Sequence, residues 1–284
     1  MQIMEYKKLT KKFNIPSIGI GTWTIGGSME KDFTNDSKEI QTIKDAIRLG
    51  YTHIDTAELY GNGHCEELIG EAMKDFDREK LIIASKVFKT NLKYNDVITA
   101  CKNSLKRLQT TYIDIFMIHS PNRTIPIEET MKAMDFLVEK KLIRFIGVSN
   151  FSVENIKEAQ GYSKNKIVVN QIPYNLKIRN KDPSSGCTNM ESEIIPYCQK
   201  NNIIVTAYRP LERRFLLKSN AVLDSLAKKY NKTKAQIAIN WLISKKNIIT
   251  IPKSSNIKHL KENLGSIGWK LNDEDIKLLD ETNF

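Results

Sequence analysis

Hydrophobic and polar positions follow two repeating patterns along the chain: short apolar segments, and longer segments with one apolar face. The short segments are rich in β-branched residues and almost continuously hydrophobic. This is typical of strands that are buried on both faces of a parallel sheet. The pattern predicts eight strands, at 17–23, 51–57, 80–87, 112–119, 141–150, 166–172, 202–208 and 247–254.

The amphipathic segments between these strands predict helices. Lys38–Leu49 has apolar residues at helical spacing and is followed by Gly50, a residue suited to a helix C-terminus. Thr233 and Gln236 have the spacing of a capping box, which predicts a helix over 234–244. The remaining helices are predicted at 66–74, 95–108, 127–139, 152–160, 190–200, 220–230, 256–265 and 273–281.

Eight strands that are each followed by a helix, with no low-complexity linker between them, predict an α/β fold. We interpret it as a (β/α)8 TIM barrel in one domain spanning 1–284. Residues 4–16 are compatible with a short hairpin ahead of the first strand. A doubly wound sheet is the competing fold. It would carry a glycine-rich fingerprint after its first strand, and GIGTW at 19–23 lacks the second half of that motif.

Composition and charge narrow the function classes. The net charge of +11 is compatible with a polyanionic partner. However, no basic run stands apart from the acidic residues, so we favour a compositional bias and expect no nucleic-acid partner. The N-terminal residues lack the apolar core of a signal peptide, and the apolar runs are too short to span a bilayer. We therefore expect a cytoplasmic protein without a membrane partner.

The cysteines are also informative. None of the four belongs to a CxxC pair, and none has the spacing to a histidine that zinc ligands usually show. Reduced structural thiols and no metal site are the expectation. The four are Cys65, Cys101, Cys187 and Cys198.

Every predicted strand ends on a polar or aromatic side chain. Because active sites of such barrels lie at the carboxyl ends of the strands, these residues are expected to converge. Taken singly, Asp55 could cap a loop and His119 could be an ordinary hydrogen-bonded histidine, whereas Lys86 at the end of an apolar strand needs a partner. The strand-end residues are Trp23, Asp55 with Tyr60 on the following loop, Lys86, His119, Ser149, Asn150, Gln171, Tyr208, Lys253 and Ser254.

The motifs that contain these residues resemble the aldo-keto reductase superfamily. The segments GIGTW, HIDTAELYGNG, SKVF, IHSP, GVSNF, VNQIPYN, YRPL and IPKSSNIKHLKEN occur in order over essentially the whole chain. The prokaryotic branch that contains methylglyoxal reductases is the most similar. The resemblance implies an oxidoreductase that prefers NADP(H), with NAD(H) possible, and that reduces aldehydes, α-dicarbonyls or aldoses. It also implies a small-molecule carbonyl substrate and a monomer or weak homo-oligomer.

The resemblance assigns the catalytic tetrad to Asp55, Tyr60, Lys86 and His119. Carbonyl reduction needs a hydride on carbon and a proton on oxygen, and a free tyrosine titrates near 10. Lys86 is therefore expected to lower the pKa of Tyr60 and make it a better general acid. Asp55 would hold Lys86 charged, and His119 would orient the substrate oxygen.

The same resemblance assigns the cofactor contacts. Ser149, Asn150 and Gln171 match residues that bind the nicotinamide carboxamide, and Tyr208 matches the aromatic residue that stacks on the ring. The other matching positions are Lys253 and Ser254 for the 2′-phosphate, Glu262 and Asn263 for the adenine, His259 where many relatives have arginine, and Arg209 and Leu211 in YRPL. Arg209 could grip the pyrophosphate together with Arg213 and Arg214, or these could form a solvated basic loop.

Trp23 and Phe88, together with His119, are the expected substrate contacts. The short segment after the last predicted helix suggests an open site that tolerates several small aldehydes. Two alternatives remain open at this point. The same residues could oxidise a sugar or an alcohol, with Tyr60 as the base, or the barrel could bind a nicotinamide nucleotide as a regulatory subunit.

Overall fold

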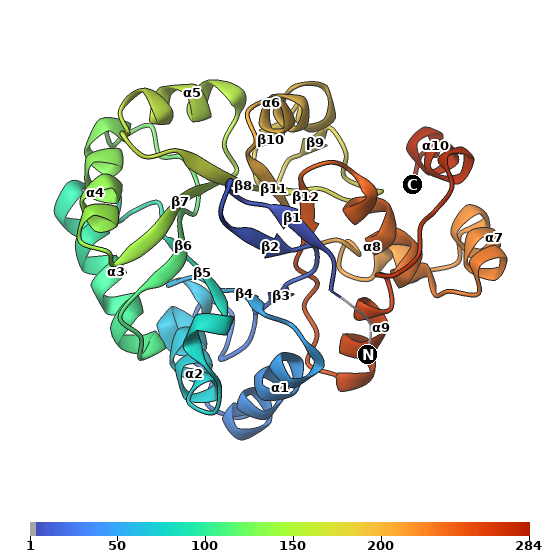
Figure 1. The fold of residues 1–284 in the computed structure, drawn as a ribbon, viewed down its shortest axis with the longest axis horizontal. Helices are drawn as coiled ribbons and strands as arrows, with labels where there is room; N and C mark the ends of the chain where they lie inside the picture. Colours follow the sequence, from blue (N-terminus) through green and yellow to red (C-terminus); the bar gives the residue numbers. More distant parts are fainter. Residues whose placement is uncertain (1–3) are drawn as a thin grey trace.

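The β-branched segments pair into one curled parallel sheet in the computed structural model, which describes residues 4–284 (Figure 1). Within that range, eight strands follow the order β12-β11-β8-β7-β6-β5-β4-β3. The helices surround this sheet, so the predicted (β/α)8 barrel is confirmed. The strands are β3 (Ile20–Gly21), β4 (His53–Asp55), β5 (Ile82–Val87), β6 (Ile113–Ile118), β7 (Ile143–Ser149), β8 (Ile167–Pro173), β11 (Ile204–Tyr208) and β12 (Ile248–Thr250).

Hydrogen bonds between the first and last strands close the barrel. The backbone N–H of Gly19 donates to the Thr250 carbonyl at 2.8 Å, and the N–H of Thr250 donates to the Ser17 carbonyl at 3.0 Å. These bonds lie just outside β3, which spans two residues rather than the predicted 17–23. The apolar pattern predicts a buried strand over 17–23, but regular strand pairing occupies only Ile20–Gly21 of this segment.

Alternate residues of each strand point into and out of the barrel, as the pleat requires. Ile82 and Ala84 of β5 belong to an apolar cluster inside the barrel, whereas Ile83 and Val87 pack in the larger core beneath the helices. The inner stripe of β5 then continues to the buried Lys86. The barrel interior is therefore apolar along the lower part of the strands and becomes polar toward their carboxyl ends.

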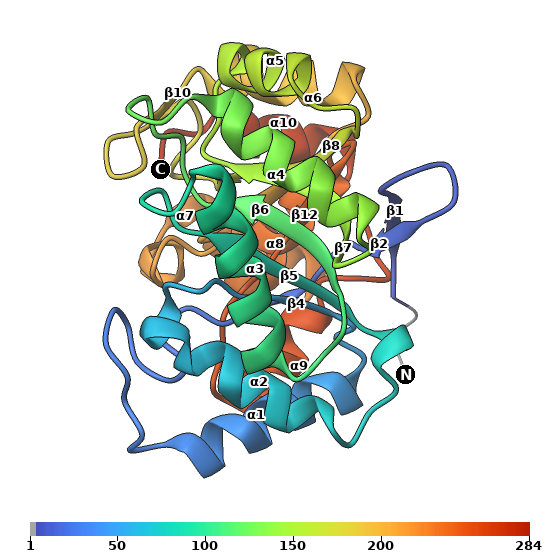
Figure 2. The ribbon, with the colours of Figure 1, turned by 90° about the vertical axis from the view of Figure 1, so that its left-hand side faces the viewer.

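The predicted N-terminal hairpin is present and closes one end of the barrel. Its strands β1 (Tyr6–Lys8) and β2 (Asn14–Pro16) pair antiparallel. Leu9 and Ile15 are buried in the inner apolar cluster, with Phe13 packed against it. The hairpin projects at one end of the molecule, opposite the long loop that leads to α1 (Figure 2).

The helices follow the predicted order with small shifts at their ends. Gly50 ends α1 in the left-handed conformation, and the capping box of Thr233 and Gln236 opens α8 as predicted. The helix predicted at 190–200 begins with a π-helical turn at Met190–Ile194. The helices are α1 (Asp36–Leu49), α2 (His64–Met73), α3 (Tyr94–Leu108), α4 (Ile127–Glu139), α5 (Val153–Gly161), α6 (Ile195–Lys200), α7 (Ala221–Tyr230), α8 (Lys234–Ser244), α9 (Ile257–Leu264) and α10 (Asp273–Glu281).

One further element, the short hairpin of β9 (Lys181–Asp182) and β10 (Cys187–Thr188), was not anticipated. It lies in the long connection between β8 and α6, where the turn-forming sequence Asp-Pro-Ser-Ser-Gly at 182–186 was the available signal. In the described part of the chain, no helix is both long and apolar enough to cross a membrane.

Candidate active site

The four predicted catalytic residues converge at the carboxyl ends of β4, β5 and β6. Lys86 Nζ lies 2.6 Å from Asp55 Oδ1 and 3.3 Å from the Tyr60 hydroxyl. The same ammonium donates to the Thr56 carbonyl at 2.8 Å. The ring of His119 meets that of Tyr60 edge-on, with centroids 5.9 Å apart. Three strands that are adjacent in the barrel thus deliver side chains from distant parts of the sequence to one point.

Lys86 is fully buried and remains charged. Burial acts to lower its pKa, but the attraction of Asp55 and the hydrogen bond with Tyr60 outweigh that effect and leave the pKa above its ordinary value. Asp55 is held on its other oxygen as well, because Gln171 Nε2 donates to Asp55 Oδ2 at 2.7 Å. The pair is therefore a fixed ion pair inside the barrel.

Two opposed effects determine the pKa of Tyr60. Lys86 does act to lower it, as predicted, but burial of the phenol is the larger effect and raises the pKa above its ordinary value. The sequence indicates that the charged Lys86 lies next to Tyr60, but it does not show how deeply the phenol is buried. Tyr60 is consequently held as a protonated phenol beside a permanent ammonium.

His119 is neutral at physiological pH. Burial, with a further contribution from the charge of Lys86, lowers its pKa to about 3. Its Nδ1 is buried and makes no hydrogen bond to the described residues. A neutral imidazole can donate or accept a hydrogen bond, but it lacks the acidic second proton of an imidazolium ion. Tyr60 is therefore the better candidate for the proton donor.

The turn that presents Tyr60 needs the glycines of the sequence YGNG. Gly61, Asn62 and Gly63 have φ values of 54°, 50° and 87°. A Cβ on Gly61 would lie 2.1 Å from the carbonyl oxygen of Gly26, so only glycine permits this approach. The long loop after Trp23 therefore packs directly against the turn that carries Tyr60.

Aromatic side chains flank the tetrad, and two of them, Trp23 and Phe88, are predicted substrate contacts. The rings of Trp23 and Tyr60 meet edge-on with centroids 4.9 Å apart. Phe88 meets His119 in the same way at 6.1 Å. Trp23 remains 43% exposed, so this aromatic surface faces the outside of the barrel mouth.

The residues predicted to bind the nicotinamide carboxamide form a hydrogen-bonded network next to the tetrad. Asn150 Nδ2 donates to the His119 carbonyl at 3.1 Å, and the Tyr208 hydroxyl donates to Asn150 Oδ1 at 3.0 Å. Ser149 Oγ donates to the Gln171 carbonyl at 3.0 Å. Asn150 has a φ of 63°, a conformation that asparagine tolerates better than most residues. The structure thus brings these four residues together with Asp55 and His119.

Arg209 has a partner that sequence reasoning missed. Its guanidinium lies 2.5 Å from Asp182 on the β9–β10 hairpin and over the ring of Tyr208. Arg213 and Arg214 are exposed on the same loop, whereas Leu211 packs against the main core. Arg209 is therefore held by an ion pair with Asp182, whereas the side chains of Arg213 and Arg214 face solvent.

The residues predicted for the adenosine end lie after β12 and along α9. Lys253 and His259 are exposed, and Glu262 is half-buried. Ser254 is buried, and its Oγ accepts from the N–H of Asn256 at 3.0 Å. Asn263 is buried against the hydroxyl of Tyr51. Lys253 and His259 thus face solvent, whereas Ser254 and Asn263 already serve the local structure.

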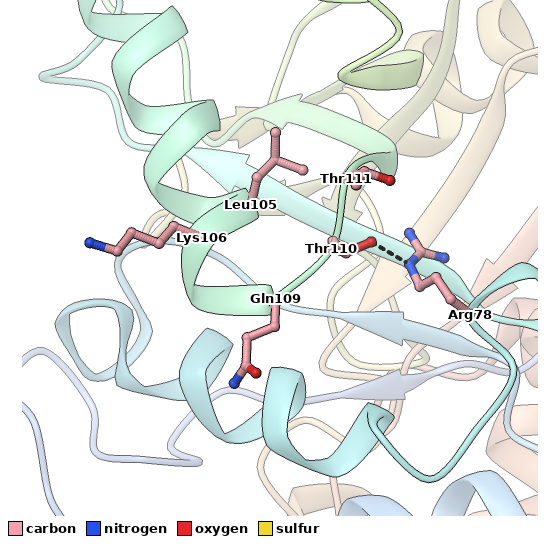
Figure 3. A pocket seen from close by; sticks show the side chains of 6 residues that line it. All are labelled: Arg78, Leu105, Lys106, Gln109, Thr110 and Thr111. Carbon is pink, nitrogen blue, oxygen red and sulfur yellow. Dashed lines mark hydrogen bonds between the residues drawn. The ribbon is translucent and has the colours of Figure 1, made fainter.

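An open surface pocket of about 500 Å³ lies away from these residues, between α3 and the segment that leads into β5 (Figure 3). Arg78 lines it. The Nε of Arg78 donates to Thr110 Oγ1 at 3.0 Å, and its Nη2 lies 2.8 Å from Asp114. None of the residues predicted to act in catalysis or cofactor binding lines this pocket. Residues 4–284 also contain no group of three or more His, Cys, Asp or Glu residues that could hold a metal ion.

The fold and the site define a class: a (β/α)8-barrel oxidoreductase with a buried lysine–aspartate pair beside a tyrosine. Comparison with known proteins agrees. The family profile described as "Aldo/keto reductase family" matches residues 17–283. Methylglyoxal reductase YeaE of Escherichia coli (strain K12) is 34% identical over 274 residues, covering 94% of this chain and 91% of that protein.

Solved structures give the same result. A thermostable aldo-keto reductase crystallised with the inhibitor epalrestat has a TM-score of 0.92 and 44% identity, covering 98% of this chain and 99% of that one. An aldo-keto reductase from Klebsiella pneumoniae in complex with NADPH has a TM-score of 0.87 and 30% identity, covering 98% and 94%. The chain belongs to the aldo/keto reductase family, a family of oxidoreductases.

Proposed function

We propose that the protein is an NADPH-preferring reductase of small aldehydes and α-dicarbonyls such as methylglyoxal, with Tyr60 as the general acid. The observation that carries this proposal is the Tyr60 hydroxyl 3.3 Å from Nζ of Lys86, with the rings of Trp23 and Phe88 flanking Tyr60 and His119. The substrate class is supported by the similarity to methylglyoxal reductase YeaE, and the cofactor by the neighbour solved with NADPH.

The residues at the barrel mouth fit a nicotinamide nucleotide. The amide groups of Asn150 and Gln171, with the Ser149 hydroxyl, offer the donors and acceptors that a carboxamide requires. Tyr208 offers an aromatic ring beside them, and the exposed Lys253 offers a cation for a 2′-phosphate. These residues would hold NADPH, which supplies a hydride to the carbonyl carbon when bound.

The chain's own residues supply the other half of the reaction. The Tyr60 hydroxyl transfers its proton to the carbonyl oxygen of the substrate, and the charge of Lys86 stabilises the phenolate that remains. Asp55 keeps Lys86 charged and in position. The neutral ring of His119 holds the carbonyl oxygen by a hydrogen bond and so aligns it with Tyr60.

Replacing Tyr60 by phenylalanine tests the proposal. Tyr60→Phe should lower kcat/KM for methylglyoxal about 10³-fold, within the range typical of general acid catalysis. The Kd for NADPH, measured by fluorescence quenching, should change less than about twofold because the ring remains. Tyr6→Phe on the exposed hairpin is the matched control. If the wild-type protein oxidises no NADPH with any small aldehyde, or if Tyr60→Phe retains more than about a tenth of the wild-type rate, the proposal is wrong.

A further inference from the structure

Glu58 lies between two members of the tetrad in the sequence but its carboxylate points to a different part of the barrel mouth. Its Oε1 accepts hydrogen bonds from the backbone N–H of Phe88 at 2.6 Å and from Asn91 Nδ2 at 3.0 Å. Its own N–H donates to the Lys86 carbonyl at 3.2 Å. Glu58 therefore connects the loop that carries Tyr60 to the loop that follows β5.

The bond to Phe88 lies at the point where the chain leaves β5. Residues Phe88 to Asn91 form a tight turn, closed by the Asn91 N–H on the Phe88 carbonyl at 2.9 Å. The next loop is tied to the same turn, because Asn122 Nδ2 donates to the Lys89 carbonyl at 2.8 Å. Holding the N–H of Phe88 fixes the backbone from which its ring projects toward His119.

The Glu58 carboxylate offers the backbone a charged hydrogen-bond acceptor. Hydrogen bonds between a charged acceptor and a backbone N–H are shorter and stronger than neutral ones, and the 2.6 Å distance agrees with that. Glu58 is only partly exposed, and its burial raises the pKa of the carboxyl despite the two hydrogen bonds. The Glu58 carboxylate is therefore partly desolvated at the position where it holds the turn formed by residues 88–91.

We propose that Glu58 is a positioning residue that fixes Phe88 against His119 and thereby shapes the substrate entrance beside Phe88. This inference rests on the proposed function, which makes Phe88 a wall of the substrate site. Glu58 touches neither the substrate carbonyl nor the proton that moves. It acts through the position of one aromatic ring, so its effect falls on substrate binding rather than on proton transfer.

Two substitutions of Glu58 separate its hydrogen bonds from its charge. Glu58→Gln keeps an oxygen that can accept both hydrogen bonds, whereas Glu58→Ala removes it. With NADPH as the reductant, Glu58→Ala should raise KM for benzaldehyde about tenfold and KM for methylglyoxal less, with kcat within about twofold of wild type. Glu58→Gln should keep both KM values within about twofold. We expect these outcomes because benzaldehyde is larger than methylglyoxal and would contact the ring of Phe88 over a larger area.

A double-mutant cycle tests whether the effect passes through Phe88. In a Phe88→Ala background, Glu58→Ala should add less than about twofold to KM for benzaldehyde, because the ring that it positions is gone. If the two changes multiply independently, the positioning role is wrong. It is also wrong if Glu58→Ala lowers kcat at unchanged KM, or if Glu58→Gln is as impaired as Glu58→Ala.

Amide hydrogen exchange gives a readout that does not need turnover. The segment Lys86–Asn91 should exchange about tenfold faster in Glu58→Ala and at the wild-type rate in Glu58→Gln. Should Glu58→Ala not fold, Asn91→Ala removes one of the two bonds and should shift exchange and KM in the same direction by a smaller factor. A wild-type protein without aldehyde reduction overturns the proposed function, whereas unchanged exchange in a folded Glu58→Ala overturns the role of Glu58.

Discussion

Lys86 Nζ and Asp55 Oδ1 lie 2.6 Å apart inside the barrel, where neither side chain is more than 2% exposed. Two buried charges are stable in such a place only because each compensates the other and the remaining oxygen of Asp55 is hydrogen-bonded by Gln171. The pair is therefore both a structural requirement of this barrel and the source of the positive charge next to Tyr60.

Breaking this pair from one side should destabilise the protein strongly. Lys86→Met leaves the carboxylate of Asp55 buried without its counter-ion, which costs about 3–5 kcal/mol in typical buried pairs. The double variant Lys86→Met/Asp55→Asn buries no charge and should be more stable than Lys86→Met alone. Urea unfolding followed by circular dichroism measures four proteins: the wild type, Lys86→Met, Asp55→Asn and the double variant. Additive losses in the double variant would contradict a compensated pair.

The pH dependence of catalysis should reflect Tyr60 and not His119. The proton donor must be protonated, so kcat/KM is at its full value below the pKa of Tyr60 and declines as pH rises through it. Because burial raises that pKa, the decline should begin only near or above pH 10. The pKa of His119 is lowered to about 3, so no step in kcat/KM attributable to it should occur between pH 5 and 8. An inflection near 6.5 that disappears in His119→Gln would contradict this assignment.

Lys253 should discriminate between the two nicotinamide cofactors. It is exposed at the end of the segment after β12, and a 2′-phosphate distinguishes NADPH from NADH. Lys253→Met should weaken NADPH about tenfold, which corresponds to about 1.4 kcal/mol, and NADH less than twofold. Fluorescence titration measures both constants at fixed ionic strength. Lys258→Met, another exposed lysine at the start of α9, is the matched control and should leave both constants unchanged.

His64 should make the stability of the long first loop depend on pH. Its Nδ1 lies 2.7 Å from Glu67 Oε2, its Nε2 lies 2.9 Å from Asp36 Oδ1, and Phe33 of the loop packs on its ring. Burial acts to lower the pKa of His64, but these two carboxylates outweigh it and raise that pKa.

A raised folded-state pKa stabilises the fold fully below the unfolded value, near 6.5, and the stabilisation is lost as pH rises through the folded value. His64→Gln should therefore lower Tm more at pH 6 than at pH 9. Thermal melts of both proteins at the two pH values test this, and an equal loss at both would contradict it.

Much of the site could be predicted because each functional residue lies at a strand end, and strand ends are visible in the hydrophobic pattern. Asp55, Lys86 and His119 follow apolar runs, and parallel strands of a barrel present their carboxyl ends on one face. The contacts between the loops around the site could not be predicted in this way. Glu58 bonds to Phe88, and Arg209 to Asp182, across loops that no periodic pattern relates.

The sequence by itself determined the order of the elements, the barrel and the residues that meet at its mouth, because strand and helix periodicity and the twist of parallel strands are encoded locally. Only the tertiary structure decided how deeply each group is buried. Burial outweighs the effect of Lys86 on the pKa of Tyr60 and keeps His119 neutral, because the cost of a charge depends on every atom that replaces water around it. That environment is assembled from loops far apart in the chain, so it exists only once the barrel has closed.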